Sequence, residues 1–318
     1  MIRARIINAV KVALWNLSPN IFEQLVPKNY PQTFSIGIYS GNTPLNLQPA
    51  PGVRNPVLTA NDITDVPAGF VADPFMIQID NTWYMFFEVF DRIARQGKIG
   101  LAVSPNGKDW DYRAIVLCES FHIAYPRVFL QHDRQWMIPD TPGHGIRLYE
   151  AEAFPYQWNY VGTIIEDTRL VDPTFFECHG QYWILACTTP CEQQQEMKLY
   201  HAEEICGDWT EHILSPFPWS GISNARQGGS PILFNRELYR FAQDGVPDYG
   251  NRVRVYKVDQ IDTKTYSEFE VEASPVLQRG EEKWNSGGMH HLDAHELSEN
   301  NWIACVDGWH LTDNSPRS

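Results

Sequence analysis

The sequence predicts an all-β protein, a five-bladed β-propeller in which the N-terminal segment closes the last blade. A unit of two strands recurs five times at a spacing of about 50 residues, and its last copy lacks the outer strands. Segments typical of strands, bounded by Gly, Pro, Asn and Asp, dominate the chain after about residue 35. A pair of β-sandwiches is the alternative, but it would not explain the fixed period or the split last unit.

Each unit starts with a short strand at a proline, then a turn, then a strand rich in Trp and Tyr. The first strands are expected at residues 72–76, 125–129, 171–176 and 229–234, with a weaker fifth copy at 291–297. The second strands follow at 82–87, 135–138, 182–185, 238–241 and 301–304. Third strands are expected in step with them, at 99–103, 146–149, 197–200 and 253–256.

The fifth unit runs out of chain after its second strand. Phe34–Gly41 has the pattern of a third strand and Asn55–Leu58 that of a fourth, so we expect them to complete this blade. Such a ring leaves only short strand edges exposed. The predicted organisation is therefore one propeller domain over 34–318, preceded by a helical extension over 1–33.

Residues 1–17 carry Arg3, Arg5 and Lys11 among apolar residues. Lys11 interrupts the apolar stretch and no small-residue cleavage site follows, which argues against a signal peptide. We expect a short helix that packs on the body, with peripheral membrane contact through residues 1–17 as the alternative.

Composition excludes some classes of partner. Lys and Arg number 25 against 39 Asp and Glu, a formal charge of −14, so no nucleic acid partner is expected. No run of about 20 apolar residues is present, so no membrane-spanning helix is expected either. The six cysteines form no Cys-x-x-Cys pair, which favours buried free thiols over zinc and, with no export signal found, a cytoplasmic protein.

A propeller directs the starts of its inner strands toward one axis, so residues beside the repeated prolines should meet in a funnel. These residues are Asp73, Tyr125, Arg127, Asp172, Arg226, Gln227, His290, His291 and Asp293. Paired carboxylates in a water-accessible cleft suit acid–base chemistry at an acetal. Aromatic rings in loops, which stack on sugars, are expected at Trp219, Tyr249, Trp284 and Trp309.

Each of these assignments has a structural alternative. Asp before Pro also bonds nearby backbone amides in turns. Arg127 and Arg226 either clamp an anionic ligand or pair with the aspartates, and the histidines either bind ligand or are satisfied within the core. Glu88, which ends the second strand of blade one, either reaches the rim of the funnel or is a solvated carboxylate.

Seven short motifs, taken together, are specific: residues 37–44, 70–75, 83–88, 99–102, 125–129, 171–176 and 226–229. They resemble the N-terminal propeller domain of plant glucosamine inositolphosphorylceramide transferases and of stand-alone bacterial proteins that share it. More distantly, the pattern is similar to glycoside hydrolase family 43.

The likeness to family 43 implies that Asp73 is a general base and Asp172 a carboxylate that tunes the general acid. The acid of that family, a Glu two residues before the blade-four proline, corresponds to Gly229 here. Losing an acid typically costs about 10²–10⁴-fold in rate. We therefore expect either an enzyme acting on a carbohydrate or glycoconjugate with Glu88 as acid, or a non-catalytic glycan- or glycolipid-binding propeller. No cofactor or catalytic metal is expected, although the sequence is compatible with a calcium ion at the centre of the propeller.

Overall fold

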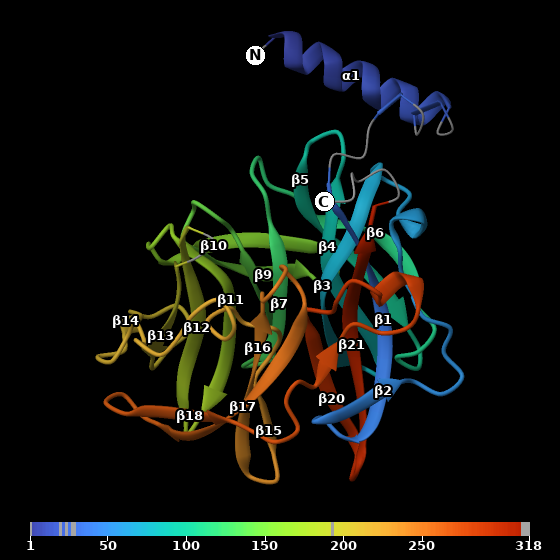
Figure 1. Ribbon diagram of the computed structural model, residues 1–318. Helices are drawn as coiled ribbons and strands as arrows, with labels where there is room; N and C mark the ends of the chain where they lie inside the picture. Colours follow the sequence, from blue (N-terminus) through green and yellow to red (C-terminus); the bar gives the residue numbers. More distant parts are fainter. Residues whose placement is uncertain (1, 19–20, 23–24, 27–29, 192–193, 313–318) are drawn as a thin grey trace.

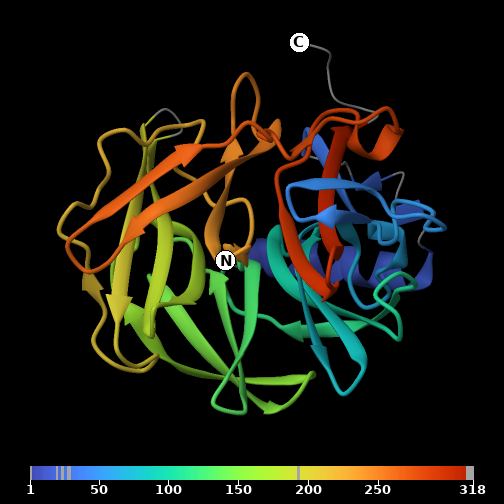
Figure 2. The same cartoon turned by 90° about the horizontal axis from the view of Figure 1, so that it is seen from below.

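Five antiparallel sheets surround a central axis in the computed structural model (Figures 1 and 2). The structure describes residues 2–18, 21, 22, 25, 26, 30–191 and 194–312. The predicted all-β, five-bladed propeller is confirmed.

Each blade contributes four strands, ordered from the axis outward. Blade one holds β3 (Ala68–Ile79), β4 (Thr82–Asp91), β5 (Gln96–Ser104) and β6 (Asp111–Leu117). Blade two holds β7 (Ala124–Gln131), β8 (Arg134–Asp140), β9 (Ile146–Ala153) and β10 (Gln157–Ile165). Blade three holds β11 (Leu170–Cys178), β12 (Gln181–Cys191), β13 (Gln194–Ala202) and β14 (Thr210–Glu211). Blade four holds β15 (Ile232–Phe234), β16 (Glu237–Asp244), β17 (Arg252–Ile261) and β18 (Tyr266–Glu270), with β19 (Leu277–Gln278) beside β17. Blade five holds β20 (Leu292–Ser298), β21 (Asn301–Leu311), β1 (Gln32–Thr43) and β2 (Asn46–Pro49).

Blade five joins the two ends of the described chain. β1 pairs with β21 in an unbroken antiparallel register from Gln32 opposite Leu311 to Gly41 opposite Trp302. This confirms the predicted closure of the last blade by the N-terminal segment.

The predicted fourth strand of this blade, Asn55–Leu58, is wrong. A tight turn lets β2 pair directly with β1, while Leu58 makes an isolated bridge to Ile36. Asn55 instead imitates a strand neighbour through its side chain. Its Oδ1 accepts the N–H of Ile38 at 2.8 Å and its Nδ2 donates to the Ile38 carbonyl at 3.1 Å.

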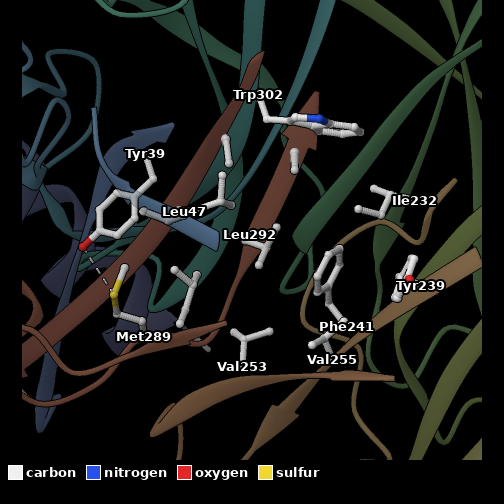
Figure 3. Close-up of a cluster of buried hydrophobic side chains, with 14 of the residues drawn as sticks. Tyr39, Leu47, Ile232, Tyr239, Phe241, Val253, Val255, Met289, Leu292 and Trp302 are labelled. Atoms are coloured by element: carbon white, nitrogen blue, oxygen red, sulfur yellow. Dashed lines mark hydrogen bonds between the residues drawn. The ribbon is translucent and has the colours of Figure 1, made fainter. Parts of the chain in front are cut away.

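Neighbouring blades pack through apolar side chains that alternate along the strands. Figure 3 shows the interface of blades four and five, where Tyr39, Leu47 and Leu292 lie opposite Phe241 and Val255. Similar clusters fill the other four interfaces.

The inner strands β3, β7 and β11 share a bulge. Two residues of each have no ladder partner, namely Asp73-Pro74, Tyr125-Pro126 and Asp172-Pro173. The first residue of each pair has a positive φ, at 51°, 46° and 49°. A bulge re-aims side chains, and strained φ values of this kind gather at functional sites.

The N-terminal extension begins with α1 (Ile2–Leu17), which lies across one end of the propeller axis (Figure 1). Leu14 and Trp15 pack with Phe22 and Val26, which follow α1 in the chain, and with Ile93 in the segment after β4. Two short 3₁₀ helices lie elsewhere, η1 (Ala60–Asp62) and η2 (Lys283–Asn285). Within the described chain, no helix combines the length and apolar content needed to cross a bilayer. The side chains of Arg3 and Arg5 lie outside the described residues.

The cysteines with described side chains are free thiols, but they are not all buried as expected. Cys187 and Cys305 are buried, Cys178 is half-buried, and Cys118 and Cys206 are exposed. The side chain of Cys191 lies outside the described residues, so the zinc alternative is not addressed there.

Ile38 tests how much stability the closing strand supplies. Ile38 is fully buried between blades five and one, so Ile38→Ala should lower the free energy of unfolding by about 2–5 kcal/mol. Leu311→Ala is the matched control, because Leu311 lies on the paired strand β21 but is exposed, and its loss should cost less than about 0.5 kcal/mol. Urea unfolding measures both, and equal losses would contradict this account of the closure.

Candidate functional site

Five carboxyl groups gather around the axis at the level of the bulges. They belong to Asp73 on β3, Glu88 on β4, Asp140 on β8, Asp172 on β11 and Asp307 on β21. After burial itself, their mutual charges are what raise the pKa values of Asp73, Glu88 and Asp140. They therefore form one electrostatic site.

Two members of this group, Asp140 and Asp307, were missed by the sequence reasoning. Glu88 in blade one pairs with Ala72, the residue directly before the bulge. Asp140 holds the same position in blade two, where it pairs with Ala124. Counting the position of Glu88 through the repeats would have found Asp140. Asp307, on the second strand of blade five, carries no proline to mark it.

Asp172 forms an ion pair with Arg226. The Asp172 carboxylate accepts hydrogen bonds from Arg226 Nε at 2.5 Å and Nη2 at 3.3 Å, and from Gln243 Nε2 at 3.1 Å. Burial alone would lower the pKa of Arg226. The negative charge of Asp172 has the larger effect, so the pKa of Arg226 is raised well above its usual value. The guanidinium also lies over the ring of Tyr249, 5.2 Å from its centre. Asp172 thus fixes a cation beside the funnel.

Asp307 and His290 form a second pair. Asp307 Oδ1 lies 2.7 Å from His290 Nδ1, and its Oδ2 accepts the N–H of Asp73 at 3.0 Å. Burial opposes the charged form of each group, yet their attraction dominates, so the pKa of His290 is raised and that of Asp307 lowered. This pairing favours the charged form of His290, whose Nε2 lies 3.7 Å from Asp73 Oδ1.

The other three carboxyl groups hold their protons unusually well. Burial is the largest cause, and it raises the pKa of Asp73 to about 7 and those of Glu88 and Asp140 well above their usual range. Within the described chain, Oε1 of Glu88 and Oδ1 of Asp140 have no hydrogen-bond partner. His122 Nε2 is 3.8 Å from Glu88, but burial lowers the pKa of His122, so it supplies no cation at neutral pH. His290 and Arg226 favour the ionised form of Asp73, whereas the charges that act on Glu88 are all negative and favour its protonated form.

Solvent reaches part of this group. The side chain of Asp73 is 11% exposed and that of Glu88 8%, whereas Asp307 is fully buried. The exposed ring of Tyr249, 5.3 Å from the ring of His290, and the half-exposed side chain of His122, 3.8 Å from Glu88, lie beside them, and we call this surface the funnel mouth. Asp73 and Glu88 are thus the least buried of the five carboxyl groups.

Several predicted ligand-binding residues lie where solvent does not reach. At most 1% of the surface is exposed at Tyr125, Gln227, His291 and Asp293. The Tyr125 hydroxyl accepts the N–H of Gly229 at 3.0 Å, and His291 Nε2 donates to the Pro74 carbonyl at 3.0 Å. The first contact crosses the axis from blade two to the segment before β15 of blade four, and the second joins blade five to blade one.

Asp293 and Arg127 are also engaged within the protein. Asp293 accepts the hydroxyl of Ser230 at 2.7 Å and the N–H of Met76 at 2.9 Å. Arg127 Nε donates to the Phe175 carbonyl at 3.2 Å, which joins blade two to blade three.

The loop aromatics divide in the same way. Tyr249 and Trp219 are exposed, whereas Trp284 and Trp309 are buried, and Trp309 belongs to β21 rather than to a loop.

Gly229 has no room for a side chain. Its φ is +136°, and a Cβ built there would lie 1.7 Å from the Leu292 carbonyl oxygen. The position of the family-43 acid is therefore closed by the backbone of blade five.

Asp73, His290 and Asp307 also bring three potential metal-ligand atoms within 4.8 Å of one another. Calcium prefers about six to eight oxygen ligands, and His290 is already committed to Asp307. The trio fits an ion pair beside Asp73 better than a calcium site.

Gly229→Ala tests the closed position. The substitution should lower the free energy of unfolding by at least about 3 kcal/mol, because the backbone is strained for any side chain and Leu292 cannot move freely. Gly162→Ala is the control, since a Cβ at Gly162 meets nothing within 4 Å. Urea unfolding of Gly229→Ala that matches the wild type would contradict the assignment.

The raised pKa of Asp73 predicts a dependence of stability on pH. The folded protein keeps this proton up to about pH 7 while the unfolded chain loses it near its usual pKa of 3.8, so the free energy of unfolding should fall as pH rises through that window. Asn tolerates the same φ and does not titrate. The free energy of unfolding of Asp73→Asn relative to the wild type should therefore increase by roughly 1–3 kcal/mol as the pH rises from about 5 to 8. The exposed Asp248→Asn variant should follow the wild-type curve. Parallel curves for Asp73→Asn would show that Asp73 titrates normally.

Comparison with known proteins now adds to this geometry. A thermostable family-43 glycoside hydrolase has the same fold, with a TM-score of 0.54 and 14% identity over 80% of this chain and 98% of that one. Glucosamine inositolphosphorylceramide transferase 1 of Oryza sativa subsp. japonica is 33% identical over 297 residues, and that of Arabidopsis thaliana is 32% identical over 302. These matches cover 87% and 88% of this chain but 40% and 39% of the relatives. The family model for the N-terminal region of glucosamine inositolphosphorylceramide transferase 1 matches residues 28–309, and the chain belongs to this family.

Proposed function

We propose that this carbohydrate-related propeller acts on a glycan or glycoconjugate by general acid–base chemistry at the funnel mouth. The observation that carries the proposal is the difference between Asp73 and Glu88, the two least buried carboxyl groups of the site, on adjacent strands. The pKa of Asp73 is raised to about 7 by burial against the opposing charges of His290 and Arg226, whereas burial and the neighbouring carboxylates all raise the pKa of Glu88. Carboxyl groups whose pKa values are separated by their surroundings divide naturally into a base and an acid.

In the proposed reaction, the Asp73 carboxylate removes a proton from the attacking water or hydroxyl. Glu88 gives its proton to the leaving oxygen of the acetal. His290, held by Asp307, places a positive charge 3.7 Å from Asp73 and favours its ionised form. Glu88 would thus perform from blade one the role that Gly229 cannot perform from blade four.

Arg226 and Tyr249 are the proposed ligand contacts. The ring of Tyr249 offers a flat face of the kind that stacks on sugars, and Arg226 offers charge to an anionic substituent. The curated relatives are named for glucosamine and inositolphosphorylceramide, so glycoconjugates that contain an amino sugar or an inositol phosphate are the first ligands to test. The chain spans about 40% of those relatives, and their transferase activity is not part of the proposal.

A non-catalytic glycan- or glycolipid-binding propeller is the second candidate. The observation that favours it is Gly229, because the side chain that protonates the leaving group in the family-43 likeness has no place here. Tyr249 and Arg226 would serve such a module equally well.

Leaving-group chemistry separates the two carboxyl roles. Glu88→Gln should slow glycosides with poor alkyl leaving groups by about 10²–10⁴-fold, and should slow activated aryl glycosides much less, because these need no protonation. Asp73→Asn should slow both kinds by a similar factor. In the wild type, the rate should rise with pH as Asp73 ionises near pH 7.

The Asp248→Asn variant serves as the control and should retain wild-type rates. Glycan binding that survives Asp73→Asn, with turnover of no glycoside by the wild type, would replace the enzyme with the binding module.

A further inference from the structure

The outward face of α1 is apolar. Ile6, Val10, Ala13 and Leu17 are spaced by four, three and four residues, which places them on one side of the helix. Their exposure is high, at 58% for Ile6, 61% for Val10 and 85% for Leu17. A helix that serves only to pack on its own protein has the opposite pattern, with its apolar side turned inward.

The last turn of α1 is anchored to the propeller. Leu14 and Trp15 meet Phe22, Val26 and Ile93, and Arg92 Nη2 donates to the Val26 carbonyl at 2.5 Å. These contacts hold the helix to the turn after β4. Leu14 and Trp15, which make these contacts, lie outside the apolar stripe, and the stripe itself is turned to solvent.

The charge of this segment differs in sign from that of the rest. Residues 1–22 contain Arg3, Arg5 and Lys11 and no Asp or Glu. The remaining chain has 22 Lys and Arg against 39 Asp and Glu. A basic segment with an exposed apolar stripe complements an anionic lipid surface, which the acidic body does not.

The same end of the propeller carries the funnel mouth. The N–H of Arg92, directly after β4, donates to the Pro67 carbonyl just before β3, so this turn lies at the start of the inner strand that leads to Asp73. The start of β1 and the residues before it lie at this end as well. Tyr30 packs edge-on against Phe70 of β3, and the ring of Phe34 stacks on that of His290, with 4.7 Å between the ring centres. Figure 1 shows α1 across this end of the axis.

We propose that α1 lies in the headgroup region of a membrane rich in anionic lipid, with Ile6, Val10, Ala13 and Leu17 turned into the acyl boundary. The funnel mouth then faces the lipid surface. A second copy of the chain is a poorer occupant, because pairing two such helices would bring together the cationic segments of both. The membrane contact stands without the acid–base proposal, and the consequence that the funnel meets headgroup sugars rests on it.

Vesicle sedimentation of the full chain tests the contact. The wild type should bind vesicles of phosphatidylcholine with about one quarter phosphatidylglycerol more tightly than pure phosphatidylcholine, and the difference should shrink between about 0.1 M and 0.5 M salt. Val10→Asp should weaken binding by about tenfold or more, because it removes the centre of the stripe. Asn8→Asp, the same charge change outside the stripe, should weaken it by no more than about fivefold.

Two controls separate the outcomes. Ile213→Asp, at a comparably exposed apolar residue of the propeller, and Asp73→Asn should both bind vesicles like the wild type, which keeps this test independent of the catalytic one. Absence of wild-type binding to anionic vesicles, or equal binding by wild type and Val10→Asp, would overturn the proposal. So would a dimer in sedimentation velocity that Val10→Asp dissociates, since the stripe would then be covered by a second copy.

Discussion

The bulge before each inner-strand proline is the constraint on which the centre of the molecule depends. A left-handed residue followed by proline leaves backbone N–H and C=O groups without ladder partners in a place where little water reaches, and such groups must be satisfied. Side chains of a neighbouring blade do this. Asp307 accepts the N–H of Asp73, while His291 and Cys305 donate to the carbonyl of Pro74. Ring closure between blades five and one is therefore polar at the axis and apolar around it.

The same requirement creates the electrostatics of the funnel. Carboxyl groups crowd around the bulges, and the described structure supplies close cations for two of them, Arg226 for Asp172 and His290 for Asp307. Burial and the mutual repulsion of these carboxyl groups raise the pKa values of the rest. A scaffold that must satisfy strained backbone at its axis thus generates groups with separated pKa values, and the stability given up there is typical of functional sites.

The ring of blades could be predicted from the sequence because the repeat is periodic. The location of Asp73 and Asp172 at the axis could be predicted because each precedes the proline that marks an inner strand. The second-strand residues Asp140 and Asp307 carry no such mark. His291 and Asp293 were expected in the funnel, but both are buried in contacts that join blade five to its neighbours, His291 with the Pro74 carbonyl and Asp293 with Ser230 and the N–H of Met76. The pairing of Arg226 was left open, because it depends on a contact across 54 residues that spacing alone does not reveal.

The location of Glu88 changes the direction from which a bound acetal would be protonated. In the likeness to family 43, base and acid stand across the axis from each other, on blades one and four. In the proposed reaction both would come from blade one, and Arg226 and Tyr249 of blade four would hold the substituents from across the funnel, so the scissile bond would lie along blade one. Ile93, five residues after Glu88 in the chain, packs against Leu14 and Trp15 of α1. A ligand presented at a lipid surface under α1 would therefore reach the blade of the proposed acid and base before it reaches the rest of the funnel.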